Sequence, residues 1–105
     1  MNLLNNVILE GTVAKDVSYK DLGEGKKLCT FKVAHTRLFE GSIAETSYFD
    51  CEMYGIMAEQ LHSKIKTGKG IRVVGRLKYK VFTDCEGREI SSVVIVCEHI
   101  EFRIN

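Results

Sequence analysis

The sequence predicts an all-β domain in which five strands form a small Greek-key barrel, with one short helix between the third and fourth strands. Two observations indicate this fold. Five stretches alternate apolar and polar side chains with the two-residue period of a strand, and the stretch between the third and fourth repeats its apolar residues every three or four positions. At 105 residues the chain is long enough for one hydrophobic core, so we expect a single domain over residues 1–105.

The first two predicted strands flank a turn that contains glycine. Residues 7–13 form the first strand, which residues 15–20 are expected to continue beyond a bend. The turn at residues 21–26 contains two glycines and three charged side chains, a composition typical of a hairpin connection. Residues 28–36 form the second strand. Its core face contains Cys29, Phe31, Val33 and His35.

The third predicted strand, residues 46–55, follows a loop at residues 37–45 and has an unusual outer face. The core face contains Phe49, Cys51 and Met53, and the outer face contains Tyr48, Asp50, Glu52 and Tyr54. Two tyrosines on a polar face suit either packing against a neighbouring strand or stacking on flat ligands. Residues 56–67 then form the helix, because Leu61 and Ile65 recur at helical spacing and a glycine follows.

The fourth predicted strand, residues 71–82, has two faces of opposite chemistry. One face contains Ile71, Val73, Gly75, Leu77, Tyr79 and Val81, and the other contains Arg72, Val74, Arg76, Lys78, Lys80 and Phe82. Such a strand can bury its apolar face and expose four cations on the other face, which ends in the aromatic ring of Phe82. A basic face with an aromatic ring suits a polyanion with flat bases. A glycine inside a strand often marks a bulge, and a bulge at Gly75 would exchange the faces beyond it.

A turn at residues 84–87 and a last strand at residues 90–102 complete the order of elements. Three strands, a helix and two further strands follow one another in the OB-fold, a Greek-key barrel that binds oligonucleotides. An unrelated small barrel with one helix would have a similar pattern. The order therefore favours an OB-fold without requiring it.

The net charge of +1 does not by itself indicate nucleic-acid binding, but its distribution is uneven. Seven lysines and arginines and no acid lie between Glu59 and Asp84, a pattern that is most often a solvated surface. No apolar run approaches the roughly 20 residues of a membrane span, and the N-terminus does not resemble a signal peptide. We therefore expect a cytoplasmic protein.

Neither a metal site nor a catalytic site is predicted, and no cofactor is expected. The four cysteines contain no CxxC pair, and only Cys85, in a turn, is expected to be exposed. The three histidines lie far apart in the sequence. Asp50 and Glu52 share a face, but no nucleophile or third metal ligand accompanies them, so we do not expect an enzyme.

Five motifs in order resemble those of the bacterial single-stranded DNA-binding proteins. They are residues 6–13 (NVILEGTV), 46–51 (TSYFDC), 58–61 (AEQL), 73–77 (VVGRL) and 82–87 (FTDCEG). The resemblance covers nearly the whole chain. It implies an OB-fold that binds single-stranded DNA without strong sequence preference and without catalysis, usually as a homotetramer. It also implies a role in DNA replication, recombination and repair, and a location at the nucleoid.

The resemblance also implies where DNA binds. The aromatic residues that would stack on bases are Tyr48, Tyr54 and Phe82, with Phe39 in the loop as a weaker candidate. Lys78 and Lys80 match a basic pair that would face the phosphates. The full set of side chains expected to supply positive charge is Lys32, Arg37, Arg72, Arg76, Lys78 and Lys80.

Two departures from the family stand out. It contains no tryptophan, although members typically stack bases on tryptophan, and it stops directly after the last predicted strand, where members carry an acidic tail. Recruitment of replication and repair enzymes through such a tail is therefore not expected for this chain. Two alternatives stay open: a dimeric OB-fold like the primosomal replication protein N, which binds single-stranded DNA and a helicase, and an OB-fold module that binds other proteins.

Overall fold

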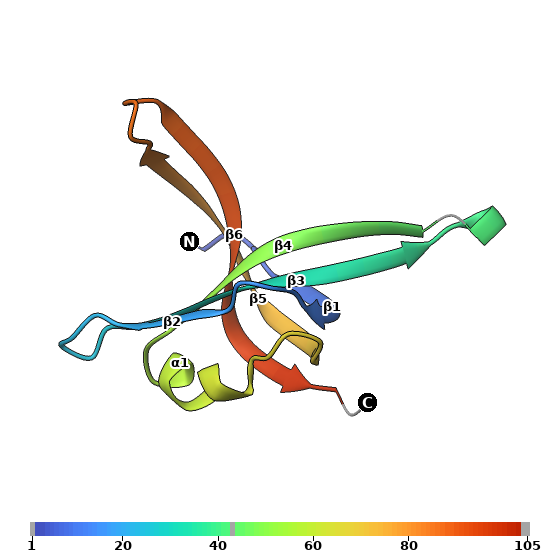
Figure 1. Ribbon diagram of the computed structural model, residues 1–105, viewed down its shortest axis with the longest axis horizontal. Helices are drawn as coiled ribbons and strands as arrows, with labels where there is room; N and C mark the ends of the chain where they lie inside the picture. Colours follow the sequence, from blue (N-terminus) through green and yellow to red (C-terminus); the bar gives the residue numbers. More distant parts are fainter. Residues whose placement is uncertain (1, 43, 104–105) are drawn as a thin grey trace.

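The computed structural model describes residues 2–42 and 44–103 and contains a closed five-stranded barrel with a short helix at one end (Figure 1). The strands are β1 (Val7–Val13), β2 (Ser18–Asp21), β3 (Lys27–Leu38), β4 (Ala44–Tyr54), β5 (Gly70–Thr83) and β6 (Glu89–Phe102). The helix is α1 (Gly55–Leu61), and two short 3-10 turns are η1 (Glu40–Ser42) and η2 (His62–Lys64). The predicted all-β OB-fold is confirmed.

The strands pair in the order β1-β5-β6-β4-β3-β2, and a further pairing of β1 with β3 closes the barrel. All neighbours are antiparallel except β4 and β6, which run parallel. Both β1 and β2 pair with β3, so the expected continuation of the first strand beyond a bend is confirmed, although it begins at Ser18 rather than Lys15. When β1 and β2 are counted together as one bent strand, the barrel has five strands.

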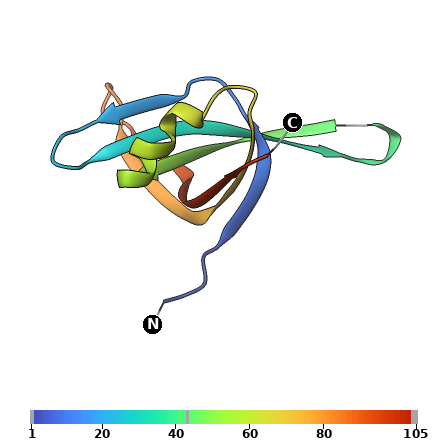
Figure 2. The same cartoon turned by 90° about the horizontal axis from the view of Figure 1, so that it is seen from below.

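The helix covers one end of the barrel (Figure 2) and is shorter than predicted. Ala58 is fully buried in the core, and Met57 and Leu61 pack against it. The α-helix ends at Leu61, and η2 follows in place of the remaining predicted turns. Ile65 is still buried, but its backbone is already extended, so the loop rather than the helix inserts it into the core. Of the described helices, none is long and apolar enough to cross a membrane.

Two long hairpins leave the barrel in different directions (Figure 1). The β3–β4 hairpin pairs as far as Leu38 and Ala44, so the two ends of the predicted loop at residues 37–45 belong to the strands. In the β5–β6 hairpin, the Asp84 side chain accepts hydrogen bonds from the backbone N–H groups of Glu86 and Arg88, which fixes the turn. Cys85 is exposed at this turn, as expected, and the other three cysteines are buried.

The bulge that Gly75 suggested lies on the partner strand. Val74 pairs with His99 and Gly75 with Cys97, so Glu98 is the extra residue and the alternation of β5 continues unbroken. Gly75 itself allows a close approach, because a Cβ atom there would lie 2.0 Å from the Val96 carbonyl oxygen. The cations of β5 therefore stay on one face throughout.

The apolar face of β5 is buried only in part. Ile71 and Val73 are fully buried in the barrel. Beyond Gly75 the hairpin leaves the barrel, and the expectation of a buried apolar face is wrong there for a single chain. The exposed residues are Leu77, Tyr79 and Val81 of β5 and Val93 of β6, which we call the apolar hairpin face.

Candidate functional site

The outer face of β4 presents two acids between two aromatic rings. Because Cys51 and Met53 point into the core, the residues between and beside them point outward. Tyr48 is 63% exposed and Tyr54 is 43% exposed. Large rings that remain this accessible can stack against a planar ligand.

The β5–β6 hairpin brings cations to the same face. Lys78 Nζ lies 5.6 Å from the centroid of the Tyr54 ring, within the range of a cation–π contact. Lys80 Nζ lies 2.5 Å from Glu52 Oε2. Phe82, further along β5, is 51% exposed. Two strands that are far apart in sequence thus place aromatic and basic groups together.

Glu52 is the buried charged side chain at the centre of this face, the one such residue among those that the structure describes. It accepts hydrogen bonds from the Tyr54 hydroxyl and the Lys80 ammonium, each at 2.5 Å. Burial alone would raise the pKa of Glu52, but the hydrogen bonds from Lys80 and Tyr54 outweigh it and lower the pKa. Glu52 is therefore an anion that holds both side chains in place.

The same contacts keep Tyr54 protonated. Burial, followed by the hydrogen bond to the Glu52 anion, raises the pKa of Tyr54 to about 12. The hydroxyl is thus a fixed donor, with Lys78 lying over the ring. The orientation of the Tyr54 ring is set before any ligand binds.

A groove of about 440 Å³ lies between the two hairpins, beside this cluster. One side is formed by β3 and β4 and the other by the β5–β6 hairpin, including Phe82. At its rim, Lys32 Nζ lies 2.5 Å from Asp50 Oδ1, and the hydrogen bond to Asp50 raises the pKa of Lys32. A neighbouring hollow of about 370 Å³ is lined by Tyr48 and also by Lys32. The predicted residues Lys32, Tyr48, Lys80 and Phe82 therefore border these two hollows, which share Lys32 and Asp16.

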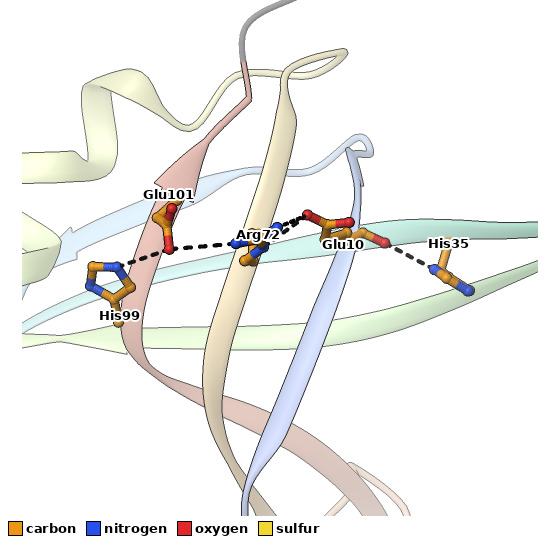
Figure 3. Close-up of polar contacts among 5 residues, drawn as sticks. All are labelled: Glu10, His35, Arg72, His99 and Glu101. Atoms are coloured by element: carbon orange, nitrogen blue, oxygen red, sulfur yellow. Dashed lines mark hydrogen bonds and ion pairs between the residues drawn. The ribbon is translucent and has the colours of Figure 1, made fainter.

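Arg72 and Arg76 share the outer phase of β5 but pair with acids on another part of the sheet, and Figure 3 shows the contacts of Arg72. Arg72 Nη2 lies 2.7 Å from Glu10 Oε2, and Nη1 lies 3.8 Å from Glu101 Oε2. Arg76 Nε lies 3.9 Å from Glu98 Oε2. Because carboxylates offset these cations, we expect them to attract a phosphate less than Lys78 does.

The remaining predicted residues lie away from the cluster. Arg37 and Phe39 are exposed near the far end of the β3–β4 hairpin, where Leu38 pairs with Ala44. The structure therefore gathers Lys78, Lys80, Tyr54 and Phe82, with Lys32 and Tyr48 adjacent. Within the described ranges, no group of three or more histidine, cysteine, aspartate or glutamate side chains is arranged to hold a metal ion.

Sequence reasoning missed the part that the acids play. The alternation of β4 placed Asp50 and Glu52 on the tyrosine face, which was the available signal. Which cations they meet depends on pairing between strands. Lys32 is the direct partner of Asp50 across β3 and β4, whereas Lys80 reaches Glu52 from a strand that does not pair with β4.

Comparisons with known proteins identify relatives of this chain. The model of the single-strand binding protein family matches residues 4–103. Single-stranded DNA-binding protein 1 of Staphylococcus aureus is 28% identical over 95% of this chain and 61% of its own length. The single-stranded DNA-binding protein of Wolinella succinogenes is 30% identical over 94% of this chain and 64% of its own length. The chain thus spans about three fifths of the length of these relatives.

A solved structure has the same fold. The Plasmodium falciparum SSB in complex with ssDNA superimposes with a TM-score of 0.86, covering 99% of this chain and 98% of that chain. The two sequences are 20% identical. The same barrel therefore forms from very different sequences.

Proposed function

Because this chain belongs to the single-strand binding protein family, we propose that it binds single-stranded DNA through the outer face of β4 and the β5–β6 hairpin. One observation carries the proposal: Tyr54, Phe82, Lys78 and Lys80 come together on one face from two distant strands. The relatives named above, single-stranded DNA-binding proteins of two bacteria, support it. No catalytic step is part of this function.

The proposed mechanism has two parts. Lysine and arginine side chains attract the phosphate backbone and release its counterions, which makes binding depend on salt. Bases then stack on the exposed rings of Tyr48, Tyr54 and Phe82, and each stacked base contributes about 1–3 kcal/mol. Since every base has a flat face, stacking tolerates any sequence. Such binding would protect single strands during replication, recombination and repair.

A titration of fluorescent oligo-dT at two salt concentrations, with duplex DNA as competitor, tests this function. We expect tight binding that weakens as salt rises, with a slope of log K against log salt of about −0.7 for each neutralised phosphate. Duplex DNA is expected to compete poorly, because its bases are already stacked on one another. Equal competition by duplex, or no binding to oligo-dT, would contradict the proposal.

We also propose that the apolar hairpin face binds other copies of this chain, as a homotetramer. Its side chains are large and unusually accessible, with Leu77 47%, Tyr79 67% and Val93 54% exposed. Burying contiguous apolar groups of this size favours association. Sedimentation at several protein concentrations distinguishes a tetramer from the dimer that the alternative hypothesis predicts. A monomer at all concentrations would rule out both.

A further inference from the structure

The groove between the two hairpins contains acids where a simple phosphate channel would contain only cations. Asp16, Asp50 and Glu52 line it together with Lys32 and Lys80. Carboxylates repel phosphates but accept hydrogen bonds from the N–H groups of bases. The groove is therefore suited to the edge of a base, while the phosphates pass outside it.

We propose that this groove is a nucleobase subsite in which Asp50 and Lys32 read the base edge, and that it prefers guanine. The inference rests on the proposed binding of single-stranded DNA and adds a base preference at one position. The volume of about 440 Å³ falls within the range of roughly 300–1,000 Å³ typical of small-molecule sites. Phe82 lies on the β5–β6 side of the groove, opposite Asp50 on β4, and supplies an aromatic surface for the base.

The Asp50–Lys32 pair has the pattern of acceptors and donors that guanine requires. The two groups face each other across β3 and β4, with Lys32 Nζ 2.5 Å from Asp50 Oδ1. Their side chains are 50% and 45% exposed, so both remain accessible to a ligand. A carboxylate accepts two parallel hydrogen bonds, and the ammonium beside it donates one.

Guanine alone among the four bases complements this pattern along its Watson–Crick edge. Its N1–H and N2–H2 groups are adjacent donors for the carboxylate, and its O6 is an acceptor for the ammonium. Thymine offers a single N–H on that edge. Cytosine and adenine each place a ring-nitrogen acceptor beside their amino group, and that nitrogen would face a carboxylate oxygen. Asp50 therefore discriminates between bases by its second hydrogen bond.

Glu52 has a different part in this subsite. Its side chain is 5% exposed and its two oxygens already accept hydrogen bonds from Tyr54 and Lys80. It thus contributes negative charge to the floor of the groove and keeps Lys80 at its edge. Asp50 is the carboxylate of this face that remains open to a base.

Oligo-dT with a single central substitution tests the proposal by fluorescence anisotropy at one salt concentration. The central residue is guanine, hypoxanthine or cytosine, and hypoxanthine differs from guanine only by lacking the 2-amino group. We expect about tenfold tighter binding with guanine than with thymine, since a good bidentate contact to a base edge discriminates against the wrong base by about this factor. Hypoxanthine is expected to lose most of that gain.

Two variants show whether Asp50 is responsible. In Asp50→Asn the ratio of guanine to thymine affinity should fall to within about twofold of one; the ratio is the readout because removing an anion strengthens binding to every oligonucleotide. Asp21→Asn is the matched control, since Asp21 pairs with Lys27 at the same 2.5 Å on the β2–β3 hairpin. It should keep the wild-type ratio.

The outcomes separate this subsite from the proposed function. Binding of oligo-dT with equal affinity for guanine, hypoxanthine and thymine at the central position overturns the subsite alone. A guanine preference that survives in Asp50→Asn overturns the assignment to Asp50 and Lys32. A failure to bind any oligonucleotide overturns the proposed function and the subsite together.

Discussion

Replacing Tyr54 and Phe82 together with alanine will weaken oligo-dT binding by about 2–6 kcal/mol, because each lost stack removes about 1–3 kcal/mol. Both rings are exposed in the unbound protein, so their truncation takes little from the barrel core. The loss should persist at moderate salt, since stacking depends on salt less than phosphate contacts do. Fluorescence anisotropy with labelled oligo-dT measures the change.

The matched control exchanges the two ring types. Tyr54→Phe with Phe82→Tyr keeps both aromatic faces, removes the hydroxyl that donates to Glu52 and adds one at residue 82. We expect this variant to bind oligo-dT with most of the wild-type affinity. If the double alanine variant bound as tightly as the wild type, the assignment of stacking to Tyr54 and Phe82 would be wrong.

Replacing Gly75 with alanine will destabilise the fold by about 3 kcal/mol or more, because overpacking against fixed backbone is among the costly substitutions. The added Cβ would lie 2.0 Å from the Val96 carbonyl oxygen and 3.2 Å from the Cys97 Cα atom. These are backbone atoms at the bulge, so a side-chain rotation cannot relieve the clash. Urea unfolding at a fixed protein concentration measures the difference in free energy of unfolding.

Gly25→Ala is the control for the loss of a glycine. Gly25 lies in the β2–β3 turn with φ of 76°, and nothing lies within 4 Å of the position that a Cβ would take. Left-handed strain alone costs about 1–2 kcal/mol there. Equal destabilisation by the two substitutions would mean that Gly75 is not a point of close backbone contact.

The alternation of side chains was sufficient to predict the strands, because the pattern is local: the sequence of one strand shows which of its side chains share a face. It placed Tyr48, Tyr54 and Phe82 on outer faces, and all three are exposed. It could not show where β5 and β6 shift register, since the extra residue is Glu98 on the strand opposite Gly75.

Contacts between distant strands were equally beyond the sequence. Lys80 and Arg72 occupy the same phase of one strand, yet Lys80 meets Glu52 beside the aromatic cluster and Arg72 meets Glu10 on β1. The apolar hairpin face illustrates the same limit. The two-residue period correctly groups Val73 with Tyr79, but only the course of the hairpin beyond the barrel decides that one is buried and the other exposed.

The turn of the β5–β6 hairpin offers a place to attach a reporter. All four cysteines lie within the described residues, and Cys85 alone is exposed, three positions from Phe82. A thiol-reactive dye would therefore modify the unaltered protein at one point and leave the buried thiols untouched. Its emission would respond to a strand arriving beside Phe82, so that the engagement of DNA by this hairpin becomes measurable without introducing a tryptophan.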